Sequence, residues 1–514
     1  MQEPTRQHAI SNTQNKDVDH SVIIVGGGPT GLMLAAELKL AGVAATVIER
    51  RHTQELIGAR AGGLQARTLE ILDQRGIVER FLKEGQAAQV GGFAMIPLSI
   101  ADFPTPHPYG LGLWQNHIER LLADWVMELG VDIQRGVAVT ELSQDDDAVS
   151  LQLSDGRSLR ASYVVGCDGG RSVVRKAAGI AFVGWDASTS NLIAEVEMEK
   201  MPPLGIHRTR HGIHSFGRLH YEIVDGKVVF KDEGPIRVMV PEPLSNLHTP
   251  PTLEMLRTAL IEVCGDDFGV HSPTVLSRFT DAARQAEHYR KGRVLLAGDA
   301  AHVHSPVGGQ GLNLGIQDAV NLGWKLAQVV KGISTPDLLD TYHTERHPIA
   351  ARVLRNSLAQ VALLRTDDRT DALREILAHL LARDEIRKEF AGMMSGLDLR
   401  YDLGEGHPLL GRRLPDVSLE TSAGTKRCFE LLRSAKPLLL NLRGTNIPGI
   451  APWHERVNLV DARYEGKWEL PVVGEVAAPD TLLVRPDGHV AWVGFGDFTG
   501  LEAALTRWVG PARI

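Results

Sequence analysis

The turn at residues 26–31 has glycines at the spacing that suits a phosphate-bearing ligand. It reads Gly26-x-Gly28-x-x-Gly31 and follows an apolar run at residues 22–25. In such a turn the first glycine permits a tight bend, the second lets a pyrophosphate approach the backbone, and the third lets helix and strand pack closely. The following helix offers free N–H groups to the phosphates, and Glu49, at the end of the next strand, can accept hydrogen bonds from ribose hydroxyls. The pattern predicts a dinucleotide site, without distinguishing FAD from NAD; the alternative is a glycine-rich packing turn.

A second glycine-rich segment, AGDAAHVHSPVGGQGLNLGIQDAV at residues 297–320, follows another apolar strand. Asp299 can accept hydrogen bonds from sugar-like hydroxyls, and the glycines allow a ring to lie almost on the backbone. A helix predicted to begin near Leu312 would point its N-terminus at that ring and stabilise negative charge there. The alternative is a loose surface turn.

A third segment, YVVGCDGGRSVVRKAAGI at residues 163–180, is a strand that turns into a helix. Asp168 could simply cap that helix. Arg171 and Arg175 lie near the helix start, where they oppose its dipole, so we expect them to face an anionic group or a nearby carboxylate.

The composition is that of an ordinary globular protein, with 514 residues, 43% hydrophobic and 23% charged residues, and a net charge of -8. The length favours two to four domains, and the mild negative charge argues against nucleic-acid binding. Three cysteines, Cys167, Cys264 and Cys428, show no CxxC spacing, which argues against a disulfide framework and favours a reducing, cytoplasmic location. No apolar run approaches the roughly 18 residues that span a bilayer. Residues 1–20 are polar and are expected to be a disordered tail.

The elements that position these motifs fall into successive regions. Strand, turn, helix and strand at residues 22–49 form a βαβ unit. Short strands with turns then predict a mostly antiparallel sheet, before RVLLAGD returns to the buried-strand pattern and long helices follow. The predicted division is a tail at 1–20, a first part of the nucleotide-binding domain at 21–180, a substrate-binding β-sheet domain at 181–275, a second part of the nucleotide-binding domain at 276–360, linking helices at 361–404, and a separate α/β domain at 405–514.

The three motifs, in this order and wide spacing, resemble the class A flavoprotein aromatic monooxygenases, typified by para-hydroxybenzoate hydroxylase and phenol hydroxylase. The resemblance covers roughly residues 20–395. It implies an α/β fold with a Rossmann-like FAD-binding domain of the GR2 type, interrupted by the antiparallel substrate domain. GRRLPDVSL and TLLVRPDGHVAWVG resemble the thioredoxin-like C-terminal domain of larger members, which include aromatic polyketide (angucycline, anthracycline, tetracycline) hydroxylases and rifampicin monooxygenases. Without a CxxC pair, a structural or dimerisation role is expected for this domain.

The resemblance also implies which residues bind FAD. The first turn would hold the pyrophosphate, Asp299 the ribityl chain, and Pro306 would border the flavin ring. Asp168 belongs to a motif associated with both FAD and NAD(P)H. The expected cofactor-binding residues are Gly26, Gly28, Pro29, Thr30, Gly31, Glu49, Arg50, Arg60, Gln115, Asp168, Asp299, Pro306, Gly309, Gly311, Leu312 and Asn313.

A substrate pocket is expected over the flavin, although the sequence identifies no catalytic acid or base. Strand alternation would turn about half of the side chains in the middle sheet inward. The candidates that line the pocket are Phe93, Met95, Trp114, His214, Phe216, Tyr221 and Pro306. Surface histidines and ordinary sheet packing are the alternative.

No metal is expected. His302 and His304 stand two residues apart within the second glycine-rich segment, where flavin contacts explain the sequence better. His343 and His347 have the spacing of a zinc helix but lack the HExxH pattern.

The resemblance implies an enzyme that uses NADPH or NADH, FAD and O2 to hydroxylate a phenolic, polycyclic polyketide-type aromatic through a flavin C4a-hydroperoxide. The alternatives are inactivation of a rifamycin- or tetracycline-type antibiotic, a Baeyer–Villiger oxidation, or a low-turnover flavoprotein that sequesters an aromatic ligand. The expected partner is a small aromatic substrate, with neither nucleic acid nor membrane, and the protein is expected to be a monomer or homodimer.

Overall fold

The computed structural model describes residues 18–56, 58, 61–89, 91–219, 221–224, 227–231, 233–444 and 446–513. The predicted tail at 1–20 therefore lies almost wholly outside the described residues, and its last residue, His20, already begins the first strand.

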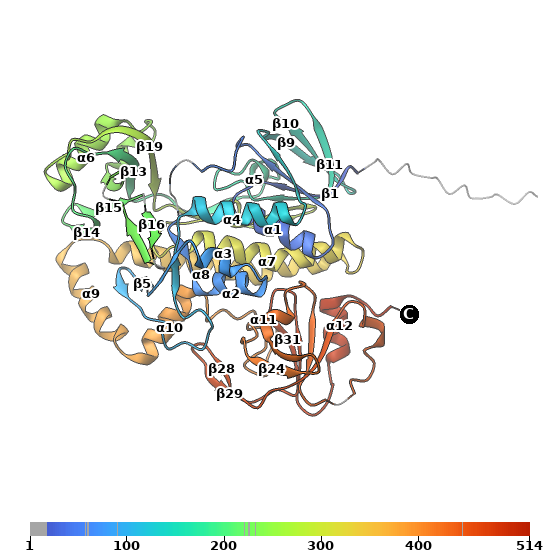
Figure 1. The fold of residues 1–514 in the computed structure, drawn as a ribbon. Coiled ribbons are helices and arrows are strands. Elements are labelled where there is room, and N and C mark those ends of the chain that lie inside the picture. The colour runs from blue at the N-terminus through green and yellow to red at the C-terminus, as the bar shows by residue number, and fades with distance from the viewer. Residues whose placement is uncertain are drawn as a thin grey trace, which may run out of the picture.

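The first sheet is built around parallel strands in the order β22 (Val294–Leu296), β11 (Ser158–Gly166), β1 (His20–Val25), β2 (Ala45–Glu49) and β8 (Asp132–Arg135), with β21 (Arg290–Lys291) antiparallel at the β22 edge. β1, β2 and β22 are almost entirely buried, which is why they read as continuous apolar runs. β22 completes the sheet that β1 begins, although the chain forms a second sheet between them (Figure 1).

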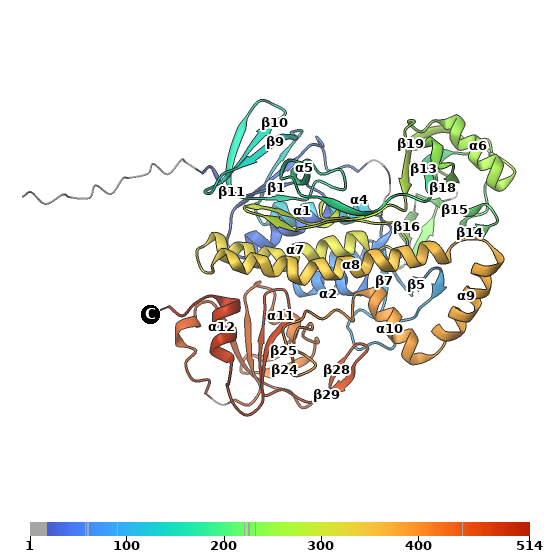
Figure 2. The same ribbon diagram turned by 180° about the vertical axis from the view of Figure 1, so that it is seen from behind.

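Helices cover this sheet and carry the site. α1 (Pro29–Leu40) follows β1 directly and packs against α7 (Gly311–Val330). α2 (Ala66–Gln74), α4 (Gln115–Glu128) and α8 (Asp340–Leu363) complete the helical layers around α1 and α7. α7 and α8 run through the middle of the molecule, with the first sheet on one side and the C-terminal strands on the other (Figures 1 and 2).

The middle sheet is antiparallel throughout, as predicted, in the order β14 (Gly205–Thr209), β15 (Gly212–Arg218), β18 (Ile236–Glu242), β13 (Ser190–Glu197) and β19 (His271–Thr280). β13 and β18 alternate strictly between buried and half-buried residues. The buried set packs with residues of α6 (Leu253–Cys264), so α6 covers one face and leaves the other toward the rest of the molecule.

The C-terminal region, residues 407–513, forms a six-stranded sheet in the order β25 (Gly424–Arg427), β24 (Ser418–Thr421), β27 (Asn458–Arg463), β26 (Leu438–Asn441), β30 (Thr481–Val484) and β31 (Val490–Gly494). β26 and β27 are parallel, and the other neighbours are antiparallel. Both faces are apolar, and the face that includes Leu439 and Leu483 packs with Trp324 of α7 and with α12 (Leu501–Val509).

α9 (Asp368–Leu381) and α10 (Asp384–Ser395) link α8 to the C-terminal region (Figure 1). Within the described ranges, no helix combines the length and the apolar character needed to cross a membrane. The shorter elements are β3 (Gly63–Leu64), α3 (Val78–Leu82), β4 (Gln86–Ala88), β5 (Gly92–Phe93), β6 (Ile96–Pro97), β7 (Gly110–Gly112), β9 (Val139–Gln144), β10 (Val149–Leu153), α5 (Val173–Ala177), β12 (Phe182–Trp185), β16 (Tyr221–Val224), β17 (Lys227–Phe230), η1 (Leu244–Asn246), β20 (Ala283–Ala286), η2 (Gly298–Ala300), β23 (His302–Val303), η3 (Pro336–Leu339), α11 (Cys428–Leu431), η4 (Ala451–Trp453), β28 (Trp468–Leu470) and β29 (Gly474–Val476).

Candidate cofactor and substrate site

The turn from β1 into α1 leaves room for a ligand at one glycine only. A methyl group at Gly26 would lie 2.4 Å from the carbonyl oxygen of Cys167, and one at Gly31 would lie 2.0 Å from the carbonyl oxygen of Gly26. A methyl group at Gly28 would meet no atom of the described residues within 4 Å. Gly28, the N-cap of α1, makes no side-chain capping hydrogen bond, and Pro29 occupies the first turn of this helix. Open space at this helix N-terminus fits a pyrophosphate.

Glu49 lies beside this turn, at the carboxyl end of β2. Its carboxylate accepts hydrogen bonds from the backbone N–H of Gly27 at 2.6 Å, and from the backbone N–H and Nε of Arg51 at 2.8 and 3.1 Å. Burial acts to raise the pKa of Glu49, but these hydrogen bonds and the charge of Arg51 hold the pKa below its ordinary value. The ionised carboxylate is therefore fixed next to the turn, where it can accept hydrogen bonds from ribose hydroxyls. Sequence reasoning missed Arg51.

Gln115 holds the segment that enters the site after residue 60. Its Oε1 accepts the N–H of Ala61 at 3.2 Å, and its Nε2 donates to Glu119 at 2.8 Å. Arg51 also donates to Glu119, at 2.9 Å, so Gln115 and Glu49 belong to one polar cluster. Arg50 is exposed beside this cluster, and Arg60 lies outside the described residues.

Asp299 lies just after β22, at the same edge of the sheet as the β1 turn, because both strands are parallel and end there. It is exposed, while its neighbour Gly298 is buried with φ of 61°. The N–H of Gly298 donates to Oδ2 of Asp318 at 3.1 Å. The loop is thus held from behind by Asp318, and Asp299 remains on the accessible side.

The N-terminus of α7 meets the segment at residues 61–65. Oδ1 of Asn313 accepts the N–H of Gln65 at 2.9 Å, and its Nδ2 donates to the carbonyl of Gly309 at 2.9 Å. Gln65 in turn donates through Nε2 to the carbonyl of Gly308 at 3.1 Å. These contacts shape the backbone around the helix start, where Gly311 and Leu312 are half-buried.

This helix start also fits a flat polar ligand. The N-cap residue Gln310 makes no side-chain capping hydrogen bond, and a methyl group at Gly309, where φ is 62°, would meet none of the described atoms within 4 Å. Nε2 of His304 and Oε1 of Gln310 are buried and have no hydrogen-bond partner among the described residues. Nδ1 of His304 binds the carbonyl of Ser305 at 2.7 Å, and burial lowers the pKa of His304 to about 4. The neutral ring leaves Nε2 as an unused acceptor beside Gly311.

Asp168 caps a helix, as the simpler of the two readings expects. Its carboxylate accepts the hydroxyl of Ser172 at 2.5 Å and the N–H of Val173 at 2.7 Å, at the start of α5. The nearby carboxylate expected for Arg175 is that of Asp168, whose charge acts to raise the pKa of Arg175, while the guanidinium donates its hydrogen bonds to the backbone carbonyls of Ala300 and Gly170, both at 2.9 Å. Arg175 therefore ties α5 to the loop that carries Asp299.

On the middle sheet, the structure separates the predicted substrate residues. Phe216 is 2% exposed and packs edge-on against Phe268, with ring centroids 5.4 Å apart. His214, two residues earlier on β15 and therefore on the same face, stacks on His207 at 5.2 Å. This is the face that α6 covers, so the structure corrects the expectation that His214 and Phe216 join Trp114 in one pocket.

The other face of the middle sheet carries a charged pair that sequence reasoning missed. The guanidinium carbon of Arg237, on β18, lies 4.9 Å from the ring centroid of Trp114. Glu195, on β13, is the cross-strand partner of Arg237. Arg237 is half-buried; burial lowers its pKa, and Glu195 acts to raise it. Trp114 itself packs over Gly62, in the segment that α7 holds.

The remaining predicted substrate residues have different surroundings. Phe93 is 5% exposed and packs edge-on against Phe390 of α10, at 5.1 Å. Met95 is exposed, with φ of 67°, and Pro306 is exposed on the loop before α7. Tyr221 begins β16, and its side chain lies outside what the structure describes.

The histidine pairs have structural partners. Nε2 of His302 lies 2.7 Å from Oδ2 of Asp318, with both side chains fully buried. The rings of His343 and His347 lie 4.6 Å apart, and Nδ1 of His343 accepts the N–H of Tyr289 at 3.4 Å. Among the residues that the structure describes, no three His, Cys, Asp or Glu side chains are grouped to hold a metal ion.

Fold and site together are typical of a dinucleotide-binding protein: a parallel sheet has, at one edge, an open glycine turn, an ionised carboxylate and the N-terminus of a second helix. Residues 19–357 match the FAD-binding domain family, and residues 407–512 match the C-terminal domain of aromatic-ring hydroxylases. The chain belongs to the class A flavoprotein monooxygenases, and FAD is the cofactor of that family.

Three similar proteins cover nearly the whole chain. One is the 12-dehydrotetracycline 5-monooxygenase/anhydrotetracycline 6-monooxygenase of Streptomyces rimosus subsp. rimosus, 43% identical over 96% of this chain and 100% of its own. A second is the rifampicin monooxygenase of Streptomyces venezuelae, 44% identical over 96% of this chain and 99% of its own. The third is the crystal structure of CabE, an aromatic hydroxylase from angucycline biosynthesis, with a TM-score of 0.87 and 39% identity over 96% of this chain and 100% of that one.

Proposed function

We propose that this flavoprotein consumes NAD(P)H and O2 to hydroxylate a phenolic, polycyclic polyketide-type aromatic. The observation that carries the proposal is its similarity, across nearly the full length, to enzymes named for the oxidation of tetracycline-type compounds and rifampicin and to a hydroxylase of angucycline biosynthesis. The C-terminal match to aromatic-ring hydroxylases supports the same class of substrate.

In this proposal the residues that would hold FAD come from the edge where β1, β2 and β22 end. The free N–H groups of α1 would bind the pyrophosphate, and Glu49 would bind the adenosine ribose. Asp299 would bind the ribityl chain, and the N-terminus of α7 would stabilise negative charge on the flavin. The proposed cofactor-binding residues are Gly26, Gly28, Pro29, Thr30, Gly31, Glu49, Arg50, Arg60, Gln115, Asp168, Asp299, Pro306, Gly309, Gly311, Leu312 and Asn313.

When bound, FAD supplies the redox chemistry that activates O2 for transfer of one oxygen atom. The chain's own residues do the rest. Trp114 offers a flat surface for an aromatic ring, and Arg237 can donate to the substrate's phenolic oxygen and favour its ionised, more nucleophilic form. Phe93, Met95 and Pro306 remain proposed neighbours of the substrate that exclude water from the reacting atoms.

The test is NADPH oxidation by the FAD-loaded protein, followed with and without candidate aromatics, under 18O2. We expect an aromatic phenol to stimulate NADPH oxidation and one labelled oxygen atom to appear in the product. Tight binding of every tested aromatic without any stimulation would overturn the proposal and favour a flavoprotein that only sequesters its ligand. A ring-expanded ester as product would instead indicate Baeyer–Villiger chemistry.

A second candidate function is inactivation of an antibiotic by oxidation. The observation that favours it is the 44% identity to rifampicin monooxygenase. Expression of the protein in a rifampicin-sensitive host should then raise the inhibitory concentration of rifampicin. An unchanged inhibitory concentration in cells that contain soluble, yellow protein would exclude this role.

We also propose that the C-terminal region is thioredoxin-like. The run β27, β26, β30 and β31, with one parallel pair followed by two antiparallel neighbours, supports this. We propose the division into an FAD-binding domain at 21–180 and 276–360, a substrate domain at 181–275, linking helices at 361–404 and this domain at 405–514. A cytoplasmic location and a monomeric or homodimeric state are likewise proposals.

A further inference from the structure

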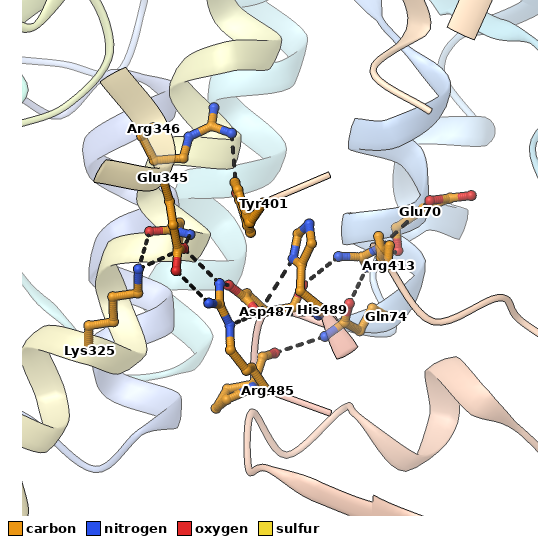
Figure 3. Close-up of polar contacts among 12 residues, drawn as sticks. Glu70, Gln74, Lys325, Glu345, Arg346, Tyr401, Arg413, Arg485, Asp487 and His489 are labelled. Carbon is orange, nitrogen blue, oxygen red and sulfur yellow. Dashed lines mark hydrogen bonds and ion pairs between the residues drawn. The ribbon is translucent and has the colours of Figure 1, made fainter. Parts of the chain in front are cut away.

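The turn between β30 and β31 inserts into the FAD-binding part of the molecule, by which we mean residues 19–357, the range that matches the FAD-binding domain family. Its residues, 485–489, read Arg-Pro-Asp-Gly-His. Arg485 donates to both carboxylate oxygens of Glu345, on α8, at 2.6 and 2.9 Å. The carbonyl of Pro486 accepts Nε2 of Gln74, on α2, at 2.9 Å. Two helices of the FAD-binding part therefore hold one turn of the C-terminal region (Figure 3).

The contacts of this turn are charged and buried. Arg485 and Asp487 are each 1% exposed. Burial acts to raise the pKa of Glu345, but the charges of Arg485 and Lys325 lower it to about 2. All of these groups are thus ionised at neutral pH. Loss of one partner would leave another charge buried and unpaired, so the turn is fixed firmly in one position.

The same stretch of α8 also holds the loop that carries Asp299. Arg346 donates through Nε to Oδ1 of Asp318 at 2.7 Å. Oδ2 of Asp318 accepts the N–H of Gly298 at 3.1 Å and lies 2.7 Å from Nε2 of His302. Arg346 and Asp318 are fully buried. Burial acts to raise the pKa of Asp318, but Arg346 and His302 outweigh it and keep the pKa below its ordinary value.

Tyr401 joins the turn to Arg346. Its hydroxyl accepts a hydrogen bond from Arg346 at 3.3 Å. Its ring lies 4.3 Å from the ring of His489 and 5.2 Å from the guanidinium carbon of Arg485. Figure 3 shows Tyr401 between Arg346 on one side and the turn on the other.

We propose that the 485–489 turn positions the cofactor-binding loop at residues 298–311 through Tyr401, Arg346 and Asp318, which are positioning residues for bound FAD. The contacts run without a gap from the C-terminal sheet to the backbone of Gly298, next to Asp299. The C-terminal region then supports the FAD site through these side chains. This inference rests on FAD binding and not on the proposed substrate.

Tyr401→Phe in the full-length protein tests the proposal with little risk to folding, since it removes one hydroxyl and keeps the ring. We expect the Kd for FAD, titrated into apoprotein, to rise about threefold to tenfold. We also expect the reduction potential of the bound flavin to become more negative, because a displaced loop aligns α7 less well with the reduced ring. Tyr464→Phe is the matched control, since the hydroxyl of Tyr464 donates to Lys467 within the C-terminal region.

A double-mutant cycle tests whether Tyr401 acts on FAD binding through Arg346. Arg346→Met should weaken FAD binding more than Tyr401→Phe, and Arg346→Lys should restore part of the loss. Tyr401→Phe should not raise the Kd for FAD further in the Arg346→Met background. In that background the Tyr401 hydroxyl has already lost the hydrogen bond that Arg346 donates to it. Wild-type FAD affinity and potential in Tyr401→Phe, whether or not its unfolding temperature falls, would overturn the proposal, as would effects that add fully in the double variant.

Discussion

At the scale of single residues, Gly26, Gly28 and Gly31 of the first turn are needed for different reasons, although the motif alone does not distinguish them. Gly26 and Gly31 are required by the protein itself, since a methyl group at either would collide with backbone oxygen. Gly28 faces open space with φ of -80°, which any residue can adopt. Only Gly28 is therefore reserved for the ligand.

Gly28→Ala should separate folding from cofactor binding. We expect the unfolding temperature of the apoprotein to change little, since Gly to Ala at an N-cap costs at most about 1 kcal/mol. The Kd for FAD should rise at least about tenfold, because the methyl group occupies the space proposed for the pyrophosphate. Gly31→Ala is the matched comparison and should destabilise the apoprotein itself. Unchanged FAD affinity in Gly28→Ala would place the phosphates elsewhere.

Asp299→Ala should weaken FAD binding more than it destabilises the fold, because Asp299 is exposed, while the buried Asp318 binds the backbone of the loop. Loss of a charge-assisted hydrogen bond predicts a rise in the Kd for FAD of about tenfold to a hundredfold. Flavin absorbance retained after gel filtration measures the effect. Asp132→Ala, an exposed change on β8, is the control. Full retention of flavin by Asp299→Ala would refute the assignment to the ribityl chain.

At the scale of elements, the sequence predicted strands better than it predicted their faces. The βαβ unit, the antiparallel middle sheet and the return to the first sheet at β22 all follow from apolar patterning. The face of β15 that carries His214 and Phe216 could not be assigned, because α6 decides which face becomes core and α6 begins at Leu253. Arg237 was missed for the same reason, since an arginine within a strand has no local signal of its surroundings.

Two neighbouring residues of β18, Arg237 and Val238, offer a matched test of which face of the middle sheet meets the substrate. Arg237→Gln should weaken the binding of a phenolic probe such as 1,8-dihydroxyanthraquinone by about tenfold, and weaken the binding of its dimethyl ether much less. Val238→Ala, on the α6 face, should lower the free energy of unfolding by about 1–3 kcal/mol with little effect on the probe. Fluorescence titration and thermal melts measure both. Equal loss of phenol and ether binding would mean that Arg237 does not contact the phenolic oxygen.

At the scale of the whole molecule, charged side chains far apart in the chain meet in the interior. Asp318, Glu345, Arg346 and Arg485 are all 7% exposed or less. Nothing in the sequence around any one of them indicates burial, because each is acceptable only once its partner from another element is present. Sequence patterning therefore recovered the layers of the fold but not the contacts between the C-terminal region and the FAD-binding part.

Acid should destabilise the protein through its buried neutral histidines. Burial lowers the pKa of His489 from 6.5 to about 4, despite the nearby Asp487. Below pH 6.5 this histidine binds a proton in the unfolded chain but not in the native protein. The free energy of unfolding therefore falls as pH drops from 6.5 toward 4, by about 3 kcal/mol for this group. Urea denaturation of His489→Gln across this range should show a shallower decline than wild type. The exposed His454→Gln is the control, and an identical decline in His489→Gln would contradict the assignment.

The alternating faces of the middle sheet have a consequence for directed evolution. Ile193, Ser215 and Met239 stand side by side across β13, β15 and β18, on the face that α6 leaves uncovered. Their strand neighbours Leu192, Phe216 and Val238 form the core on the other face. A library randomised at the first three positions would explore new substrate shapes while the hydrophobic core stays intact. A library that included the second three would lose most of its members to unfolding before any of them met a substrate.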